Sequence, residues 1–365
     1  MVEHADEFAW SGEGENAEIL VYAPDEPTAE RAFARAFKAA ELPGVQSPVH
    51  VAAAARQVGW AAVSGTHAAP DLACVPARGL LLVADADGLG IPVSGVTEHA
   101  LRGLTEVGPS LPSLNGAGVR RVCEEGALAA AEDGLVEEED LAYLGAGQGD
   151  PDAVGRRALS AGARDWEERF ELEASVTAEV LDSDGAETLE LRPGMLVLVV
   201  TVGAGDLGRL ALGTHRDRIF ARVRAGADFG SGDDLPAAPT ETEEAGDLLS
   251  AVSAAANFAD ARAARALYAL RRVLGGIAGR LDVRASWKVG GLEDQDGLLV
   301  HRKDLAAADA GRPIVSGGAV AVGTGKMWRS APPFGTPESE ERLWPWEEAG
   351  LLERWVRLDP AGGEK

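Results

Sequence analysis

The stretch at residues 194–212 constrains this chain most, because a long apolar run is followed at once by closely spaced glycines. The run Met195-Leu-Val-Leu-Val-Val-Thr-Val202 is rich in β-branched residues, which is typical of a strand buried on both faces. Gly203, Gly205 and Gly208 follow in a G-x-G-x-x-G spacing, and a helical pattern begins behind them. A glycine turn at a helix N-terminus exposes backbone N–H groups that bind phosphate. The stretch therefore predicts a strand, a phosphate-binding turn and a helix.

Two standard nucleotide motifs are nevertheless not favoured. A Rossmann site needs a second strand that ends in Asp or Glu about 20 residues further on, and that region is instead an acidic loop at residues 228–246. Lys326 also fails the P-loop pattern, because Val320 stands at the position of the first glycine and Met327 at that of Ser or Thr. The glycine turn therefore needs another explanation.

Composition limits the classes of function. The chain has 365 residues, 46% of them hydrophobic, and a formal net charge of −25. A field of that sign repels polyanions, so we expect no general DNA binding. Two cysteines, Cys74 and Cys123, do not make a disulfide framework, which favours a reducing cytoplasm. Because the sequence shows no apolar run of about 20 residues and no signal pattern, we expect a cytoplasmic protein without a membrane partner.

The periodicities predict a series of further elements. Strands are expected at residues 18–22, 78–84, 90–94, 170–181, 298–301 and 314–322, and a hairpin turn at 182–185. Helices are expected at residues 27–40, 119–133, 136–144, 151–160, 244–274 and 347–356, and in the segment that follows the glycine turn as far as 224. Residues 1–17 read as a loose polar lead-in, and the loop at 228–246 reads as exposed.

Two sets of acidic residues are candidates for metal or phosphate chemistry. Asp85 and Asp87 follow an apolar run, as in phosphatases of the haloacid dehalogenase kind, with Asp233 and Asp234 available for Mg²⁺. An Asp-Gly hairpin turn explains the same residues as well. Asp71 and Cys74 form a possible two-ligand metal corner, although such a pair of a hard and a soft ligand is more often structural.

A series of stretches in chain order is similar to the motifs of one enzyme family. They are Leu42-Pro-Gly-Val45, Asp71-Leu-Ala-Cys74, residues 126–134, Asp150-Pro-Asp-Ala-Val154, residues 200–208, Ala254-Ala-Ala-Asn-Phe-Ala259, Asp282-Val283 and Val300-His-Arg-Lys303. Together they resemble the RtcB family of RNA ligases, the tRNA-splicing type that acts in RNA repair. Members of this family join RNA 3′-phosphate or 2′,3′-cyclic phosphate ends to 5′-hydroxyl ends.

The resemblance implies a fold of the α+β class, with mixed or antiparallel sheets in the centre and helices on the flanks. It implies one domain at residues 18–330, which includes the acidic loop at 228–246. The lead-in at 1–17 precedes this domain, and a Pro- and Trp-rich tail at 331–365 follows it.

The resemblance also shows which chemistry this chain lacks. In the family two Mn²⁺ ions are held by the Asp and Cys of D-x-x-C and by histidines, and one further histidine takes GMP from GTP. Asp71 and Cys74 persist here, whereas Thr201 and Ala285 or Ser286 stand at histidine positions, and Arg169 lies where another ligand is expected. No guanylylation motif is present. We therefore expect a degenerate member that uses no cofactor, with Mn²⁺ or Zn²⁺ and GTP needed only if the activity survives.

The expected role is binding, either of an RNA 3′ end or nucleotide or of a protein partner. The residues assigned to this pocket are Asn257, His301, Arg302, Lys303, Gly203 and Gly205, with Asp71 and Cys74 as the metal remnant. The alternative is an active metal-dependent RNA ligase or phosphatase that uses Asp71, Cys74, Asp85 and Asp87.

The tail offers a third reading. In this reading the protein is a structural subunit whose tryptophans dock on a partner or on a sister copy, or else pack on the chain's own core. They are Trp344, Trp346 and Trp355 of the tail and Trp328 just before it.

Overall fold

The computed structural model describes residues 3–6, 9–53, 58–85, 89, 91–107, 111–145, 147, 149–168, 170–227, 229, 235–307, 313–316, 319–323, 330–331 and 352–360. Its strands are β1 (Glu3–Asp6), β2 (Ala9–Glu13), β3 (Glu18–Tyr22), β4 (Val45–Ala53), β5 (Val58–Ser64), β6 (His67–Ala68), β7 (Ala77–Ala84), β8 (Glu171–Val180), β9 (Leu196–Gly203), β10 (Ala238–Pro239), β11 (Asp282–Gln295), β12 (Leu298–Ala307), β13 (Pro313–Ser316), β14 (Ala319–Gly323), β15 (Ser330–Ala331) and β16 (Leu352–Pro360).

The α-helices are α1 (Glu26–Ala36), α2 (Val93–Val107), α3 (Gly116–Glu125), α4 (Ala127–Glu132), α5 (Pro151–Val154), α6 (Arg156–Asp165), α7 (Ser183–Thr188), α8 (Gly205–Arg224) and α9 (Glu243–Ala278). Short 3₁₀ turns are η1 (Phe37–Glu41), η2 (Pro70–Leu72) and η4 (Glu138–Ala142). None of these described helices is long and apolar enough to cross a membrane.

Most of the described strands form one sheet. Its order is β1-β2-β3-β4-β5-β12-β11-β7-β9-β8-β16-β14-β13, with β15 beside β12, while β6 and β10 pair separately. The pairings in the large sheet are antiparallel except for β3 with β4. The expected α+β class with a mostly antiparallel central sheet is therefore confirmed.

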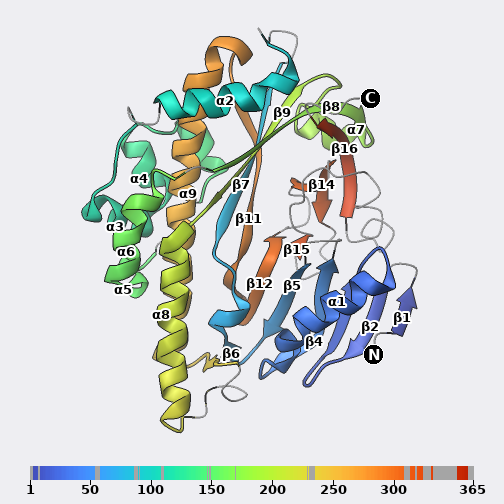
Figure 1. Cartoon of the computed structure of the whole chain (residues 1–365), viewed down its shortest axis with the longest axis vertical. Coiled ribbons are helices and arrows are strands. Elements are labelled where there is room, and N and C mark those ends of the chain that lie inside the picture. The colour runs from blue at the N-terminus through green and yellow to red at the C-terminus, as the bar shows by residue number, and fades with distance from the viewer. Residues whose placement is uncertain are drawn as a thin grey trace.

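The strand that precedes the glycine turn is buried on both sides. Leu198 and Val200 of β9 face a cluster that includes residues of α3 to α6, α8 and α9. Val197 and Val199 face a second cluster that includes residues of β11, β13, β14 and β16. Figure 1 shows α8 and α9 along one side of the long strands, with α2 to α6 beside them. A two-sided core explains why this strand lacks the usual alternation of polar and apolar residues.

Burial also explains the composition of α9, the 36-residue helix at the centre of the helical layer. Small alanines dominate its buried positions, so neighbouring helices and strands approach it closely. Thr242 caps its first turn by accepting a hydrogen bond from the N–H of Ala245. The predicted helix at 244–274 is therefore confirmed, and so are the helix that follows the glycine turn, as α8, and the strands at 18–22, 78–84 and 170–181.

Two predicted helices are each broken by a glycine. The helix expected at 119–133 divides into α3 and α4 at Gly126, whose φ is +63°. The helix expected at 151–160 divides into α5 and α6 at Gly155, whose φ is +86°. A positive φ ends an α-helix and costs glycine little.

Several other predicted elements differ from those in the structure. The hairpin turn expected at 182–185 is the start of α7, since the Asp182 carboxylate accepts from the N–H of Gly185 as a helix cap. The strand expected at 90–94 overlaps the start of α2. The helix expected at 136–144 is instead the shorter 3₁₀ turn η4. Part of the loop at 228–246 is buried, including Leu235 and Ala237.

Both ends of the chain contribute strands to the sheet. The lead-in at 1–17 holds β1 and β2, so the expectation of a loose segment was wrong. In the tail at 331–365, β16 pairs with β8 and β14 where a helix at 347–356 was expected. Trp355 packs over Gly185 of α7, which places this tryptophan on the chain's own core. Trp328, Trp344 and Trp346 lie outside the described residues.

Gly79 provides a test of this packing. A Cβ at Gly79 would lie 2.0 Å from the Trp287 ring, which is buried against β7. We predict that Gly79→Ala lowers the free energy of unfolding by about 1–3 kcal/mol through overpacking. The matched control is Gly213→Ala on α8, where a Cβ meets nothing within 4 Å and helix propensity alone raises stability by up to about 1 kcal/mol. Urea unfolding measures both, and equal stability of Gly79→Ala and wild type would contradict the packing.

Candidate functional site

The glycine turn does not hold an open anion site. Ala204 precedes α8, and the Asp165 carboxylate from α6 accepts a 2.7 Å hydrogen bond from the N–H of Leu207. A Cβ at Gly205, whose φ is +59°, would lie 3.0 Å from that carboxylate. Burial raises the pKa of Asp165, although the bond from Leu207 opposes this shift. The chain's own carboxylate therefore occupies the N-terminus of α8, where the sequence predicted a phosphate.

An arginine also forms hydrogen bonds to the same turn. Arg262 of α9 donates hydrogen bonds from its guanidinium to the carbonyl oxygens of Gly203 and Glu168. Its side chain is buried, and Asp165 and Glu168 supply the nearby negative charge. Gly203 and Gly205 therefore form the joint between β9 and α8, and the described contacts of this turn are made within the chain. Binding of a nucleotide by these two glycines stays a prediction.

The residues His301, Arg302 and Lys303 do not form a common basic surface. They lie on β12, where successive side chains point to opposite faces of the sheet. Arg302 is fully buried, and its guanidinium lies 2.7 Å from the Glu293 carboxylate. Lys303 lies over the Trp60 ring, 4.6 Å from its centroid. The alternation of the strand thus overturns the prediction of one phosphate-facing cluster.

His301 is an internal neutral side chain. It is fully buried, and its Nε2 accepts a 2.9 Å hydrogen bond from the N–H of Ala69. Burial lowers the pKa of His301 to about 4, so the ring carries no charge at neutral pH. The histidine therefore ties β12 to the chain before η2 and adds no charge for a phosphate.

The two residues of the predicted metal corner have other partners. Asp71 in η2 accepts hydrogen bonds from Nε of Arg216 on α8, at 2.8 and 3.1 Å. Cys74 is partly buried, and its backbone N–H donates to the carbonyl oxygen of Arg302. A Cβ at Gly290 would lie 2.8 Å from that of Cys74, so β11 passes close to this cysteine. A guanidinium on Asp71 disfavours a metal ion at the same carboxylate by direct repulsion.

Thr201 and Ala285, which the resemblance places at histidine positions, lie on the opposite side of the sheet from Asn257. The alternative position, Ser286, pairs with Leu80 of the helix-facing cluster and lies on the other face. Thr201 pairs with Gly79, which pairs in turn with Trp287, so these residues share one face. Ala285 lies on the same face and packs with Trp287 in the second cluster. Asn257 belongs to α9 in the helical layer. The sheet thus separates two parts of the site that the sequence suggested, and Arg169 lies outside the described residues.

The acidic residues of the phosphatase alternative are also far apart. Asp71 precedes β7 and Asp85 follows it, and the eight residues of β7 span more than about 20 Å. Asp87, Asp233 and Asp234 lie outside the described residues. Within the residues that the structure describes, no group of three or more His, Cys, Asp or Glu side chains is arranged to hold a metal. A shared site of Asp71 and Asp85 is therefore excluded by distance.

Asn257 organises the loop that borders a pocket. Its Nδ2 lies 3.0, 3.0 and 2.8 Å from the carbonyl oxygens of Cys123, Glu124 and Gly147. The amide thereby joins α9 to the end of α3 and to the loop that precedes α5. Asn257 is buried, so its side chain shapes the pocket wall.

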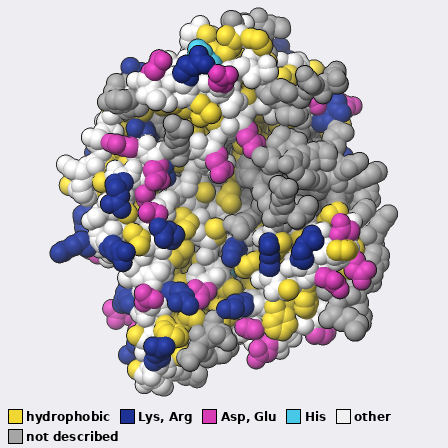
Figure 2. Space-filling model, viewed as in Figure 1, with side chains coloured by type: hydrophobic (Ala, Val, Ile, Leu, Met, Phe, Trp, Pro, Cys, Tyr) yellow, Lys and Arg dark blue, Asp and Glu magenta, His cyan; other side chains and the backbone are white. Residues whose placement is uncertain are grey.

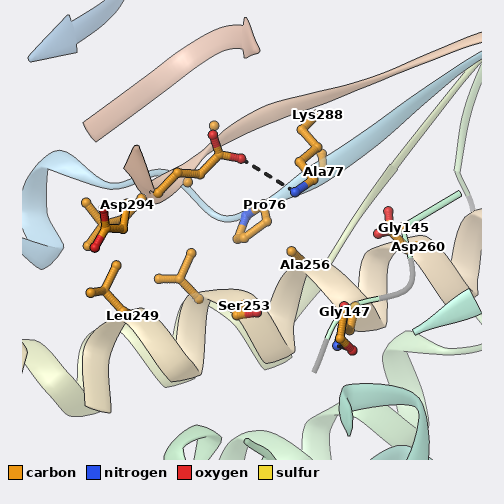
Figure 3. Close-up of a pocket in the computed structure, with 16 residues that line it drawn as sticks. Pro76, Ala77, Gly145, Gly147, Leu249, Ser253, Ala256, Asp260, Lys288 and Asp294 are labelled. Atoms are coloured by element: carbon orange, nitrogen blue, oxygen red, sulfur yellow. Dashed lines mark hydrogen bonds and ion pairs between the residues drawn. The ribbon is translucent and has the colours of Figure 1, made fainter. Parts of the chain in front are cut away.

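The pocket itself has a volume of about 460 Å³ and lies between α9, the start of β7 and the bulged part of β11. Figure 3 shows Ser253 and Ala256 of α9 facing Pro76 and Ala77, with Lys288 above them. Glycines 145, 147, 290 and 291 also line the pocket, and their lack of side chains leaves room for a ligand.

Most charges of the pocket have an opposite partner, and the Asp294 carboxylate also lines it. Arg78 and Asp260 form a buried bidentate pair, with Nη2 to Oδ2 at 2.8 Å. Burial alone would raise the pKa of Glu293, but the positive charges of Arg302 and Lys288 lower it, so the carboxylate is ionised. Lys288 lies 3.5 Å from Glu293, and about half of its side chain is exposed. The pocket is therefore close to neutral inside a strongly acidic chain.

Sequence reasoning missed Arg78, Asp260, Lys288 and Glu293. A signal for Asp260 was present, because it is a charged residue within the apolar, alanine-rich part of α9. No local pattern marks its partner Arg78, which lies 182 positions away. Only the packing of α9 on β7 joins the two.

Comparison with known proteins adds no assignment to this geometry. No family model matches the chain, and neither does any of the curated proteins.

The neutral histidines make stability depend on pH. Burial lowers the pKa of both His50 and His301 to about 4 from the ordinary 6.5. As the pH falls below 6.5, the unfolded chain takes up protons before the folded one does, so stability decreases. We predict that His301 alone contributes a loss of about 2 kcal/mol between pH 7.5 and pH 5.

Urea unfolding at both pH values measures this loss. His301→Gln keeps an acceptor for the N–H of Ala69 but does not titrate, so its stability should change less between the two pH values. The same loss in His301→Gln as in the wild type would contradict the assignment.

Proposed function

We propose that this protein binds a nucleotide or the 3′ end of an RNA without joining it to a second end, as a degenerate relative of the RtcB-like ligases. The observation that carries the proposal is the pocket shaped by Asn257, with the half-exposed Lys288 at its edge. Its volume lies in the range of small-molecule sites and suits one nucleotide. Asn257 belongs to the motif on which the family resemblance rests.

The chemistry of the pocket suits such a ligand. The glycines of the wall leave space for a base or a sugar, and Ser253 adds a hydroxyl group that can donate or accept a hydrogen bond. Lys288 is long enough to exchange its 3.5 Å contact with Glu293 for a phosphate. Arg302 remains beside Glu293 in that case, so the carboxylate keeps a positive partner.

The surface around the pocket also supports binding of a polyanion. Figure 2 shows Lys and Arg side chains gathered in a band across the lower half of the visible face, with acidic side chains both above and below it. Many arginines of α8, which lies on this face, are exposed, including Arg209, Arg218 and Arg222. Each of the three also pairs with a carboxylate, so the attraction is local and sensitive to salt.

The absence of ligation is part of the same proposal. Phosphoryl transfer of the family's kind needs metal ions and a nucleophilic nitrogen next to the phosphate. Here the guanidinium of Arg216 binds Asp71. Trp287 packs on the face of the sheet that carries Thr201 and Ala285. Cys74 and Cys123 form no disulfide, which fits a reducing cytoplasm, and we infer this as the location.

Binding is tested with a fluorescent ten-nucleotide RNA that ends in a 3′-phosphate. We predict that Lys288→Glu weakens binding at least about fivefold, since it reverses the positive charge that lines the pocket. Lys38→Glu on η1 is the matched control, because it changes the net charge equally on an element that does not line the pocket. Fluorescence anisotropy between 50 and 300 mM salt measures both variants. Equal losses in the two variants, or affinity that does not change with salt, would reject the proposal and favour a protein partner.

Ligation is tested separately with GTP, Mn²⁺ and RNA ends that carry a 3′-phosphate and a 5′-hydroxyl group. We predict no joined product above a blank without protein, because the nucleophilic nitrogen is missing. Denaturing gel electrophoresis measures the product. Joined RNA that depends on GTP would show that the protein is an active ligase and would reject this part of the proposal.

A further inference from the structure

Arg265 is a buried cation without an ionic partner among the described residues. It lies on α9, eight residues after Asn257, and only 8% of its surface is exposed. Its Nε is buried and has no hydrogen-bond partner. The other buried arginines near α9 differ, since Arg78 pairs with Asp260 and Arg262 donates to backbone carbonyls. A buried guanidinium without an ionic partner loses its hydration, and its remaining contacts do not replace all of the lost hydrogen bonds.

The neighbours of Arg265 compensate this loss only in part. Its guanidinium carbon lies 5.8 Å from the centroid of the Trp166 ring, which is a weak cation–π contact. Burial lowers the pKa of Arg265, and the negative charge of Glu167 opposes the shift. Arg265 therefore has unused capacity to bind an anion.

The same arginine borders a cavity of about 530 Å³ beside α2. The cavity wall includes the apolar side chains Leu101, Leu104, Leu111 and Phe170. Leu101 is 40% exposed although it is a large apolar residue at this wall. A ligand in the cavity would cover apolar surface at one end and meet a guanidinium at the other.

We propose that this cavity binds a small organic acid with one carboxylate and an apolar body, such as a medium-chain fatty acid. The carboxylate accepts two parallel hydrogen bonds from Arg265, and the chain lies against the leucines and Phe170. Glu167 and Glu168 also line the cavity, so a dianionic phosphate meets more repulsion than a single carboxylate does. This site is independent of the nucleotide pocket near Asn257.

Competition binding to the full-length wild-type protein tests the ligand class. Decanoate, decan-1-ol and decyl phosphate are titrated against the fluorescent probe 11-(dansylamino)undecanoic acid. Decanoate should displace the probe at a concentration at least about tenfold lower than either competitor. Equal displacement by decanol would show a purely apolar cavity, and tighter binding of decyl phosphate would show a phosphate site. Either result overturns the proposal, and so does a probe that does not bind.

Substitution of the arginine tests the residue. Arg265→Met keeps most of the packing volume and removes the buried charge, so the midpoint of thermal unfolding should stay the same or rise. Decanoate affinity should fall at least about tenfold, while decanol affinity stays unchanged. Arg272→Met is the control on the same helix, since that arginine lies over Tyr268 and does not line the cavity. Unchanged decanoate binding in Arg265→Met overturns the proposal.

If Arg265→Met fails to fold, the wild-type comparison of decanoate with decanol still decides the question. RNA binding by Arg265→Met should match that of the wild type, so a failure of this inference and a failure of the nucleotide proposal give different results.

Discussion

The packing of α9 against β7 and β9 is the interaction on which the rest of the structure depends. This helix contributes alanines and leucines to the largest apolar cluster and meets helices α2 to α5 and α8 on its other sides. Small side chains let the helix approach the sheet closely, so charged residues on it must find partners inside the layer. Three contacts provide such partners among the described residues: the Arg78–Asp260 pair, the hydrogen bonds of Arg262 to the glycine turn and those of the Asn257 amide.

Several residues that suggested chemistry in the sequence are used for structure. The Asp165 carboxylate caps α8, Arg302 neutralises Glu293, and His301 accepts a backbone hydrogen bond. A buried polar group costs several kcal/mol unless it is paired, so each of these contacts has a structural reason. Charged and polar residues beside glycines are therefore weak signals of a site when the strands around them are buried on both faces.

Both candidate sites lie beside α9, and they differ in how their charges are arranged. The pocket at Asn257 is balanced by internal pairs and adds one exposed cation, Lys288. The cavity at Arg265 has a buried guanidinium and apolar walls. The two ligands need different binding sites. A nucleotide needs many polar contacts, whereas an organic acid needs a single ion pair and an apolar surface.

The sequence by itself determined the two-sided burial of β9, the helix after its glycines and the approximate extent of α9, whereas the α+β class was expected only from the family resemblance. These features depend on local periodicity, composition and caps, such as Thr242 at the start of α9. It did not determine the breaks at Gly126 and Gly155, since a glycine takes a positive φ only where its surroundings require it.

Only the tertiary structure decided which polar residues are free to act. Alternation along β12 separates Arg302 from Lys303, and the sheet separates Asn257 from Thr201. The lack of an ionic partner for Arg265 among the described residues and the pairing of Arg78 across 182 positions are equally invisible in the sequence. Whether a charge is available depends on its distance to other charges and on its exposure to water, and both are set by contacts between distant segments.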